Sequence, residues 1–251
     1  MDLQWLLVPS FFLIALLYAS VGHGGASGYL AALSFVAVQP AEMATTALTL
    51  NLIVAGAALL SFARSGCLVK SLTWPFVIAS VPAAFLGGVM PISAKLYHVL
   101  LAAALGVAAW RLVLELPGHT TRALTRPGVA VSAPLGGGIG WLSGAVGIGG
   151  GIFLSPLLVL LRWATPKEAA ATSAAFILAN SAAGLGGRAA RAGLEYGLFW
   201  PLGAAALAGG MLGAHLGANH FSGTTLKRLL AVVLVVAAAK LLMTAAGAIR
   251  T

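Results

Sequence analysis

The sequence predicts an all-α polytopic membrane protein made of two homologous halves, which we expect to form an inverted repeat of about four or five helical segments each. Composition predicts the membrane class, because 60% of the 251 residues are hydrophobic and 8% are charged, against about 25% charged in soluble domains. Special residues that recur in both halves predict the repeat. A glycine-rich stretch in each half predicts a broken helix near mid-membrane.

Ten apolar segments follow one another along the chain. Because a helix needs about 20 residues to span a bilayer, the uncharged runs 3–41 and 127–161 each hold two helical segments. In the first half the segments are 4–21, 25–38, 42–63, 72–90 and 95–114. In the second half they are 128–146, 150–163, 167–187, 196–216 and 225–247.

A polar linker over residues 115–127 separates a first transmembrane repeat, 1–114, from a second, 128–251. Proline and glycine within this linker mark it as a loop. The duplication rests on special residues that recur at offsets of 125 to 127 positions. The pairs are Gly22 and Gly147, Gly25 and Gly150, Pro40 and Pro166, Glu42 and Glu168, Thr46 and Thr172, Arg64 and Arg191, and Trp74 and Trp200.

Basic residues are expected in short loops, and their distribution favours an inverted repeat over a parallel one. If each glycine-broken run is a hairpin, each half crosses the membrane an odd number of times. Nine basic residues then lie on one side, and four, Lys95, Arg188, Arg191 and Arg250, lie on the other. One crossing per run gives a split of eight to five, and a run of more than about 30 residues is too long for one crossing.

The two glycine-rich stretches form the core of the candidate binding site. They comprise Gly22, His23, Gly24 and Gly25 in the first half and Gly147, Gly149, Gly150 and Gly151 in the second. Glycine at this density interrupts a helix, and the freed backbone groups must be buried in protein or line a cavity. We expect a new helix to begin near Gly25 and near Gly150, with an N-terminus suited to an anion. Close packing or a tight turn is the alternative role of these glycines.

Polar side chains in the segment after each glycine-rich stretch extend the candidate site. They are Thr45, Thr46 and Asn51 in the first half, and Thr172, Ser173 and Asn180 in the second. Thr and Ser often bond to a carbonyl of the preceding turn, whereas an amide inside lipid marks a packing contact or a pathway. His23 is suited to bind an oxyanion or to titrate near neutral pH, and a backbone carbonyl that holds its ring is the alternative.

Other features exclude several classes of function. There is no Walker A, HExxH or Gly-x-Ser-x-Gly motif, so we expect no enzyme, no catalytic residue and no cofactor. The single cysteine, Cys67, excludes an internal disulfide and a cysteine-based metal cluster, and we expect no metal site. A net charge of +9 spread over loops predicts contact with membrane lipid and not with nucleic acid.

Two further patterns predict structural roles. Glu42 and Glu168 each follow a proline at a helix start, where a carboxylate suits the helix dipole, so no carboxylate is left for a proton relay in mid-span. Small residues recur every four positions and predict close helix packing in lipid. They are Ser132, Gly136, Gly140 and Gly144, and Gly209, Gly213 and Gly217.

With these residues in place, the chain resembles the sulfite exporter TauE/SafE family over essentially its whole length. The resemblance rests on Gly147-x-Gly149-Gly150-Gly151, Ser155-Pro156-Leu-Leu, Thr165-Pro166-x-Glu168-Ala and Ala-Thr172-Ser173. A weaker copy consists of Gly22-His23-Gly24-Gly25 with Ala44-Thr45-Thr46. In that copy Ala31 stands where Pro156 is expected and His23 replaces an apolar residue, so the two halves of the site are expected to be unequal.

The resemblance implies a secondary transporter that exports a small sulfur-containing anion, such as sulfite or an organosulfonate like sulfoacetate, across the bacterial cytoplasmic membrane. The anion would bind between the two glycine-rich stretches, and rocking of the repeats would expose it to either side. An importer or a channel for another small anion or metabolite is the alternative, and a scaffold that transports nothing is a third. The anion, the direction of flux, protons as the coupling ion and a homo-oligomeric state stay open.

Overall fold

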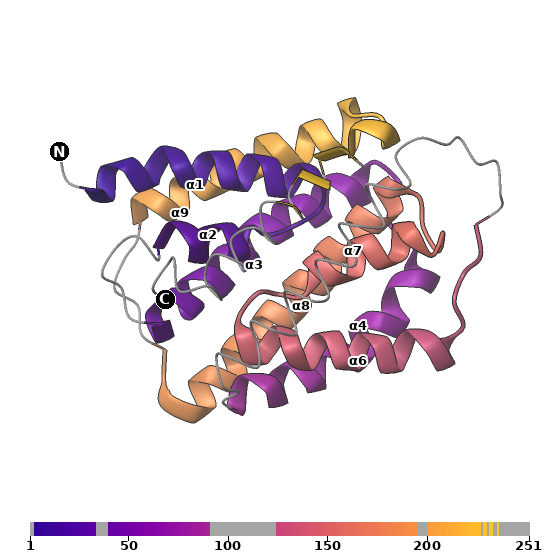
Figure 1. Cartoon of the computed structure of the whole chain (residues 1–251), viewed down its shortest axis with the longest axis horizontal. Coiled ribbons are helices and arrows are strands. Elements are labelled where there is room, and N and C mark those ends of the chain that lie inside the picture. Colours follow the sequence, from indigo (N-terminus) through magenta and orange to yellow (C-terminus); the bar gives the residue numbers. More distant parts are fainter. Residues whose placement is uncertain are drawn as a thin grey trace.

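A computed structural model of the chain describes residues 3–33, 40–90, 124–194 and 200–226, and residues 228–229, 231–232 and 235 beyond them. Helices account for all of the regular structure in these ranges (Figure 1). The first half contains α1 (Leu3–Ser20), α2 (Ala26–Leu33), α3 (Pro40–Arg64) and α4 (Lys70–Val89). The second half contains α6 (Val129–Val146), α7 (Gly151–Leu160), α8 (Pro166–Ala192), α9 (Trp200–His215) and the π-helical turn η1 (Leu216–His220).

The membrane class predicted from composition is confirmed. Four of the described helices are long and apolar enough to cross a bilayer. These spans are Glu42–Arg64, Lys70–Val89, Val129–Val146 and Pro166–Arg191. Large apolar side chains point outward from several helices, and Ile78, Val129 and Trp200 are 68%, 65% and 92% exposed, as expected for surfaces that face lipid.

Most predicted segments agree with helices to within a few residues, and α8 is the main exception. The prediction ended this segment at residue 187, but α8 continues to Ala192, so Arg188 and Arg191 lie in a helix and their placement in a loop is wrong. The alanine-rich sequence after Arg188 has high helix propensity, which explains the extension. The predicted segment 95–114, most of 225–247, most of the linker 115–127, and Lys95 and Arg250 lie outside the described residues.

Glycines hold α9 directly against α1. Gly209 and Gly213 of α9, and Gly217 of the η1 turn that continues it, pack on the main chain of Phe12, Leu16 and Ser20, respectively. A Cβ at any of these glycines would overlap a carbonyl oxygen of α1, so the close approach of the two helices requires glycine. Because the contacts advance by four residues on both helices at once, α1 and α9 are parallel.

Glycines likewise allow close packing of α6 on α4. Gly136, Gly140 and Gly144 pack on the main chain of Phe76, Ser80 and Ala84, and these contacts again advance in step, so α4 and α6 are parallel. Each of the three glycines has a carbonyl oxygen where its Cβ would lie. The prediction that the small-residue stripes serve helix packing is confirmed.

Helices α3 and α8 cross at the centre of the molecule in opposite directions. The methyl group Cδ1 of Leu48 lies beside Gly184, and Leu178 lies beside Gly56, so positions rise on α3 as they fall on α8. Figure 1 shows α1 and α9 on one side of this pair and α4 and α6 on the other.

Two groups of three helices result, and they run in opposite directions. Helix α8 is parallel to α4, since Thr73 meets Thr172 at one end and Gly88 meets Gly184 and Gly187 at the other. Helix α3 is parallel to α9, since Val54 packs on Gly210 and, further along both segments, the hydroxyl of Ser65 donates to Oδ1 of Asn219. The first group is therefore α1, α3 and α9, and the second is α4, α6 and α8.

Candidate functional site

The first break, residues 21–25, separates α1 from α2. Gly22 and Gly25 have φ of +79° and +93°, a left-handed conformation that side chains other than glycine rarely adopt. Gly24 is required for space, because a Cβ there would overlap the amide of Asn51 in α3. A Cβ on Gly22 would overlap the carbonyl of Ala170 near the start of α8. The first break therefore runs from the start of α8 to the middle of α3.

The second break, residues 147–150, separates α6 from α7. Gly147, Gly149 and Gly150 have φ of +86°, +83° and +79°. The end of α6 is capped by the N–H of Gly147, which donates to the carbonyl of Ser143 at 2.8 Å. Since α2 begins at Ala26 and α7 begins at Gly151, the predicted helix starts near Gly25 and Gly150 are both confirmed.

Asn51 joins the two breaks. Its Oδ1 accepts a hydrogen bond from the N–H of Ala26, the first residue of α2, at 3.1 Å. Its Nδ2 donates to the carbonyl of Ile148 in the second break at 3.2 Å and to the hydroxyl of Ser181 in α8 at 3.3 Å. The side chain is fully buried, so one amide ties three elements together through hydrogen bonds that water does not reach.

His23 makes a second link between the halves. Its Nε2 lies 2.9 Å from the carbonyl oxygen of Gly151 at the start of α7. For Nε2, the structure therefore agrees with the alternative given for His23, in which a backbone carbonyl holds the ring. Among the described residues, Nδ1 of His23 has no hydrogen-bond partner although it is buried, and so it remains available to a bound molecule.

The four predicted hydroxyl residues have different surroundings. Thr45 and Thr46 are buried near the start of α3. The hydroxyl of Thr172 lies 2.9 Å from that of Thr73 in α4, and Ser173 accepts a hydrogen bond of 2.6 Å from Ser155 in α7. The structure thus directs Thr172 and Ser173 toward neighbouring helices and not into the breaks.

Asn180 is buried in α8 with an unsatisfied amide. It is 0% exposed, and within the described ranges neither Oδ1 nor Nδ2 has a hydrogen-bond partner. Asn180 lies one turn after Phe176, which packs beside Gly150, and one turn before Gly184, which packs beside Gly144. The hydroxyl of Ser143, whose Cβ also flanks Gly150, is likewise buried without a partner. The second break therefore has beside it polar atoms to which no other described residue bonds.

The main chain of both breaks also offers free donors. Within the described part of the chain, the N–H groups of Gly24, Gly25, Gly149, Gly150 and Gly151 donate no hydrogen bond to the protein. Free N–H groups at a helix start form an anion site with the positive end of the helix dipole. The predicted glycines thus meet the chemical requirement for an anion site at the start of α2 and of α7.

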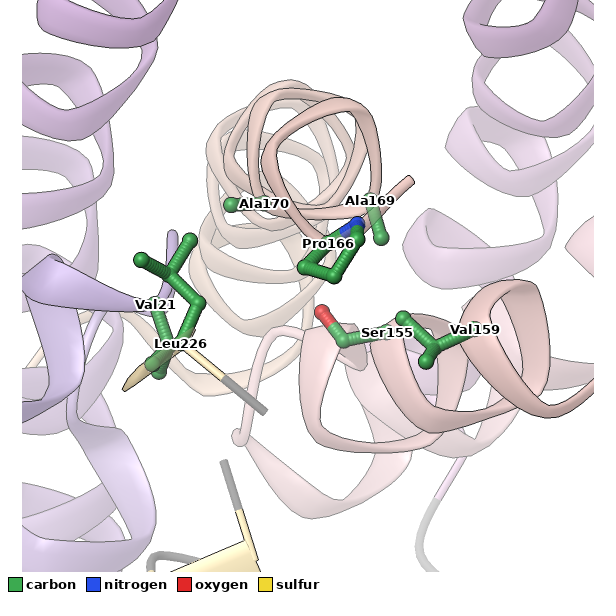
Figure 2. Close-up of a pocket in the computed structure, with 7 residues that line it drawn as sticks. All are labelled: Val21, Ser155, Val159, Pro166, Ala169, Ala170 and Leu226. Atoms are coloured by element: carbon green, nitrogen blue, oxygen red, sulfur yellow. The ribbon is translucent and has the colours of Figure 1, made fainter. Parts of the chain in front are cut away.

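A small pocket opens beside the first break, shown in Figure 2. It is bounded by Val21 of the first break, by the start of α8 and by the side of α7 that carries Ser155. Its seven lining residues are Val21, Ser155, Val159, Pro166, Ala169, Ala170 and Leu226. Among the described residues that line it, Ser155 supplies the single hydroxyl and none is charged, so this part of the lining is an apolar approach to the first break.

Carboxylates are placed outside the site. Of those in the described ranges, Glu42 and Glu168 lie in the first turns of α3 and α8, as predicted. Glu168 forms a capping box with Thr165 and an ion pair of 2.7 Å with Arg126. Among the described residues, no group of three His, Cys, Asp or Glu side chains is placed to hold a metal. The breaks are therefore electrically suited to an anion.

Sequence reasoning missed Arg188. It lies two turns beyond Asn180 on α8, and its Nη2 is 3.1 Å from the carbonyl of Ala145 and 3.4 Å from that of Gly144, at the end of α6. The four-residue spacing of Asn180, Gly184 and Arg188 puts them on one face of a helix, and this pattern could have indicated that Arg188 lies on the same side of α8 as Asn180. It was hidden because Arg188 was placed in a loop.

Known proteins are similar in sequence to this chain over most of its length. Residues 7–241 match the family described as sulfite exporter TauE/SafE. The chain belongs to this family. A probable membrane transporter protein, y4hK, of Sinorhizobium fredii (strain NBRC 101917 / NGR234) is 37% identical over 240 residues, which cover 94% of this chain and 97% of that relative. No solved structure matches the chain. This TauE/SafE family member is a multi-pass membrane protein of a transporter family and is not an enzyme.

Proposed function

We propose that this TauE/SafE family member exports a small sulfur-containing anion, sulfite or an organosulfonate such as sulfoacetate, by alternating access of two inverted repeats. The family description supports the substrate class. The free N–H groups of the two breaks and the unsatisfied Nδ2 donor of Asn180 beside the second break support an anion as the transported species. The single observation that carries the proposal is the meeting of both breaks at Asn51 in the centre of the molecule.

The order and direction of the helices support the inverted repeat. In the described part of each half, an 18-residue helix is followed by a short helix of 8 or 10 residues, a long helix of 25 or 27 residues and a further helix. The corresponding helices α1 and α6, α3 and α8, and α4 and α9 belong to opposite groups and so run in opposite directions. In transporters with such a pseudo-twofold relation the substrate site lies at the interface between the repeats, which supports a site at the two breaks.

The two breaks also contact opposite ends of the central helix pair, α3 and α8. Gly22 contacts Ala170, near the start of α8, whereas Gly147 contacts Ala44, near the start of α3. Because α3 and α8 are antiparallel, these two contacts lie on opposite sides of Asn51. Each break is therefore suited to open the site toward one side of the membrane.

The proposed transport mechanism depends on which polar groups of the breaks already have hydrogen-bond partners and which do not. In this conformation the hydrogen bonds of Asn51 and His23 hold the breaks together, so the site is closed. An anion between the breaks accepts hydrogen bonds from the free N–H groups and from the Asn180 amide, which repays the cost of burying these donors. Rocking of one helix group against the other then breaks the Asn51 contacts on one side and admits solvent there.

A flux assay tests the proposal. The purified full chain is reconstituted in liposomes loaded with sulfite or with sulfoacetate, and efflux is followed with and without a pH gradient. We expect saturable efflux of at least one of the two anions, and a rate that follows the gradient if protons are coupled. Efflux that rises linearly with concentration would favour a channel, and no flux of either anion would reject the substrate class.

Asn180→Leu tests the site within the same assay. Replacing an unsatisfied buried amide by an apolar side chain of similar volume leaves stability unchanged or raised, while it removes a polar contact with the anion. We expect Asn180→Leu to fold as well as the wild type and to lose at least about tenfold in kcat/KM. Thr49→Val is the matched control on α3, since the Thr49 hydroxyl bonds to the carbonyl of Thr45 in its own helix at 2.9 Å. Equal transport by wild type and Asn180→Leu would remove Asn180 from the path.

A further inference from the structure

Arg188 of α8 places a positive charge beside the second break, and this position differs from the solvent-exposed loop expected from the sequence. It lies four residues before the end of α8 and is half-buried. A Cβ on Gly147 would lie 3.3 Å from its Nη2, so the guanidinium touches the first residue of the second break. Its position is fixed by the carbonyls of Gly144 and Ala145 at the end of α6.

In the part of the chain that the structure describes, no acidic side chain neutralises Arg188. Among the described residues, no carboxylate lies within ion-pairing distance of Arg188, and Glu168 pairs with Arg126 at the other end of α8. A half-buried guanidinium beside the negative end of a helix is stabilised by the helix dipole. Its positive charge is offset only in part by two carbonyls, and so the region attracts an anion.

The hydrogen bonds of the guanidinium are incomplete as well. An arginine side chain has five N–H donors in a planar fork, and Nη2 supplies both of the bonds to α6. Nε is buried and has no hydrogen-bond partner among the described residues. A buried N–H without an acceptor raises the free energy of the folded state, and an anion that bonds to it would relieve that cost.

We propose that Arg188 contacts the transported anion at the mouth of the second break and sets the preference for an oxyanion. This inference rests on the proposed function and deepens it. The ligand class is a sulfur oxyanion with at least two oxygens, because Arg binds such groups through two parallel N–H···O bonds. The unpartnered Nε N–H forms this fork with the neighbouring N–H of Nη2, which gives up its long contact of 3.4 Å with the carbonyl of Gly144 when the anion binds. A halide, which offers a single acceptor centre, gains less from this fork.

Arg188 also makes the two mouths unequal. At the offset of 126 positions its counterpart in α3 is Phe62, which is fully buried and uncharged. On the first-break side, at the start of α8, Lys167 donates from Nζ to the carbonyl of Ala218 at 2.8 Å. Lysine is a point charge without a planar fork, so this side chain does not supply the bidentate contact that we assign to Arg188.

The test compares Arg188→Lys, Arg188→Gln and Arg191→Gln in the full chain. Arg191 is exposed and lies three residues further along α8, so its substitution removes an equal charge from the same end of the helix. We expect Arg188→Lys to raise the KM for sulfite efflux about tenfold with kcat within about twofold of wild type, because charge is kept and the fork is lost. Arg191→Gln should leave both constants unchanged.

A binding measurement keeps the test independent of flux. In detergent, sulfite should raise the Tm of the wild type, and Arg188→Lys should need about ten times more sulfite for an equal rise. If Arg188 serves only to cap α6, Lys also donates to the carbonyls and KM stays at the wild-type value, which would overturn this inference alone. If the wild type neither binds nor moves a sulfur oxyanion, the proposed function is rejected and this inference with it. Arg188→Gln, if it folds, should be weaker in binding than Arg188→Lys.

Discussion

Asn51→Ala is the most direct test of how the two breaks are held together. The substitution removes hydrogen bonds to the N–H of Ala26, the carbonyl of Ile148 and the hydroxyl of Ser181. It leaves all three of these groups without their partner in a region that is closed to water. The variant should therefore be less stable than the wild type and should hold the breaks less firmly.

The size of the effect follows from the number of bonds. Hydrogen bonds between side chains in a membrane protein are worth about 0.6 kcal/mol on average and up to about 1.7 kcal/mol, so three give a loss of about 2 to 5 kcal/mol. The upper part of this range is expected here, because two of the partners are backbone groups whose burial without a bond costs about 1 to 3 kcal/mol each.

The assay is reversible unfolding in mixed micelles, with helical circular dichroism recorded as a denaturing detergent is titrated in. Thr49→Ala is the control on the same helix. Since the Thr49 hydroxyl bonds to the carbonyl of Thr45 within α3, this substitution should cost less than about 0.5 kcal/mol. Combining Asn51→Ala with Ser181→Ala isolates their shared bond as a coupling energy. A loss below about 1 kcal/mol for Asn51→Ala would refute the view that this amide joins the breaks.

Three further outcomes are expected. Gly213→Leu should prevent recovery of monodisperse protein in detergent, because its Cβ would overlap the Leu16 carbonyl, whereas Gly203→Leu in the same helix meets nothing within 4 Å and should be tolerated. Thr165→Ala should lower stability to unfolding by about 1 kcal/mol through loss of the capping box of α8; an unchanged midpoint would contradict this. Partial burial raises the pKa of the Cys67 thiol, so its maleimide labelling should be slower than that of an exposed thiol at pH 7 and should accelerate as the pH rises; equal rates would contradict it.

Much of the fold could be predicted because it depends on composition and local signals. The uncharged runs predicted the spans, and the glycine pairs predicted where α2 and α7 begin. The role of Glu168 at the start of α8 also followed from its position after Pro166. The end of α8 was predicted too early, because a charged residue was taken as a loop signal although the alanines beyond it favour a helix.

The candidate site could be predicted only in part. The sequence singled out Asn51 and Asn180 as matching amides, but the repeat offset of 126 aligns Asn51 with Ile177. In the structure Asn51 is hydrogen-bonded to Ala26, Ile148 and Ser181, whereas Asn180 has no partner among the described residues. Partners of Asn51 lie up to 130 positions away, and no local pattern encodes which of two buried amides will receive them.

The sequence by itself determined the membrane class, the glycine breaks and the helix starts, because each depends on hydropathy or on conformational preferences within a few residues. The tertiary structure decided the directions of the helices, the junction at Asn51 and the position of Arg188 at the end of α6. These depend on contacts between residues far apart in the chain, such as the 44 positions between Arg188 and Gly144. Close packing of glycine-lined helices fixes such contacts, and their geometry exists only once both halves have assembled.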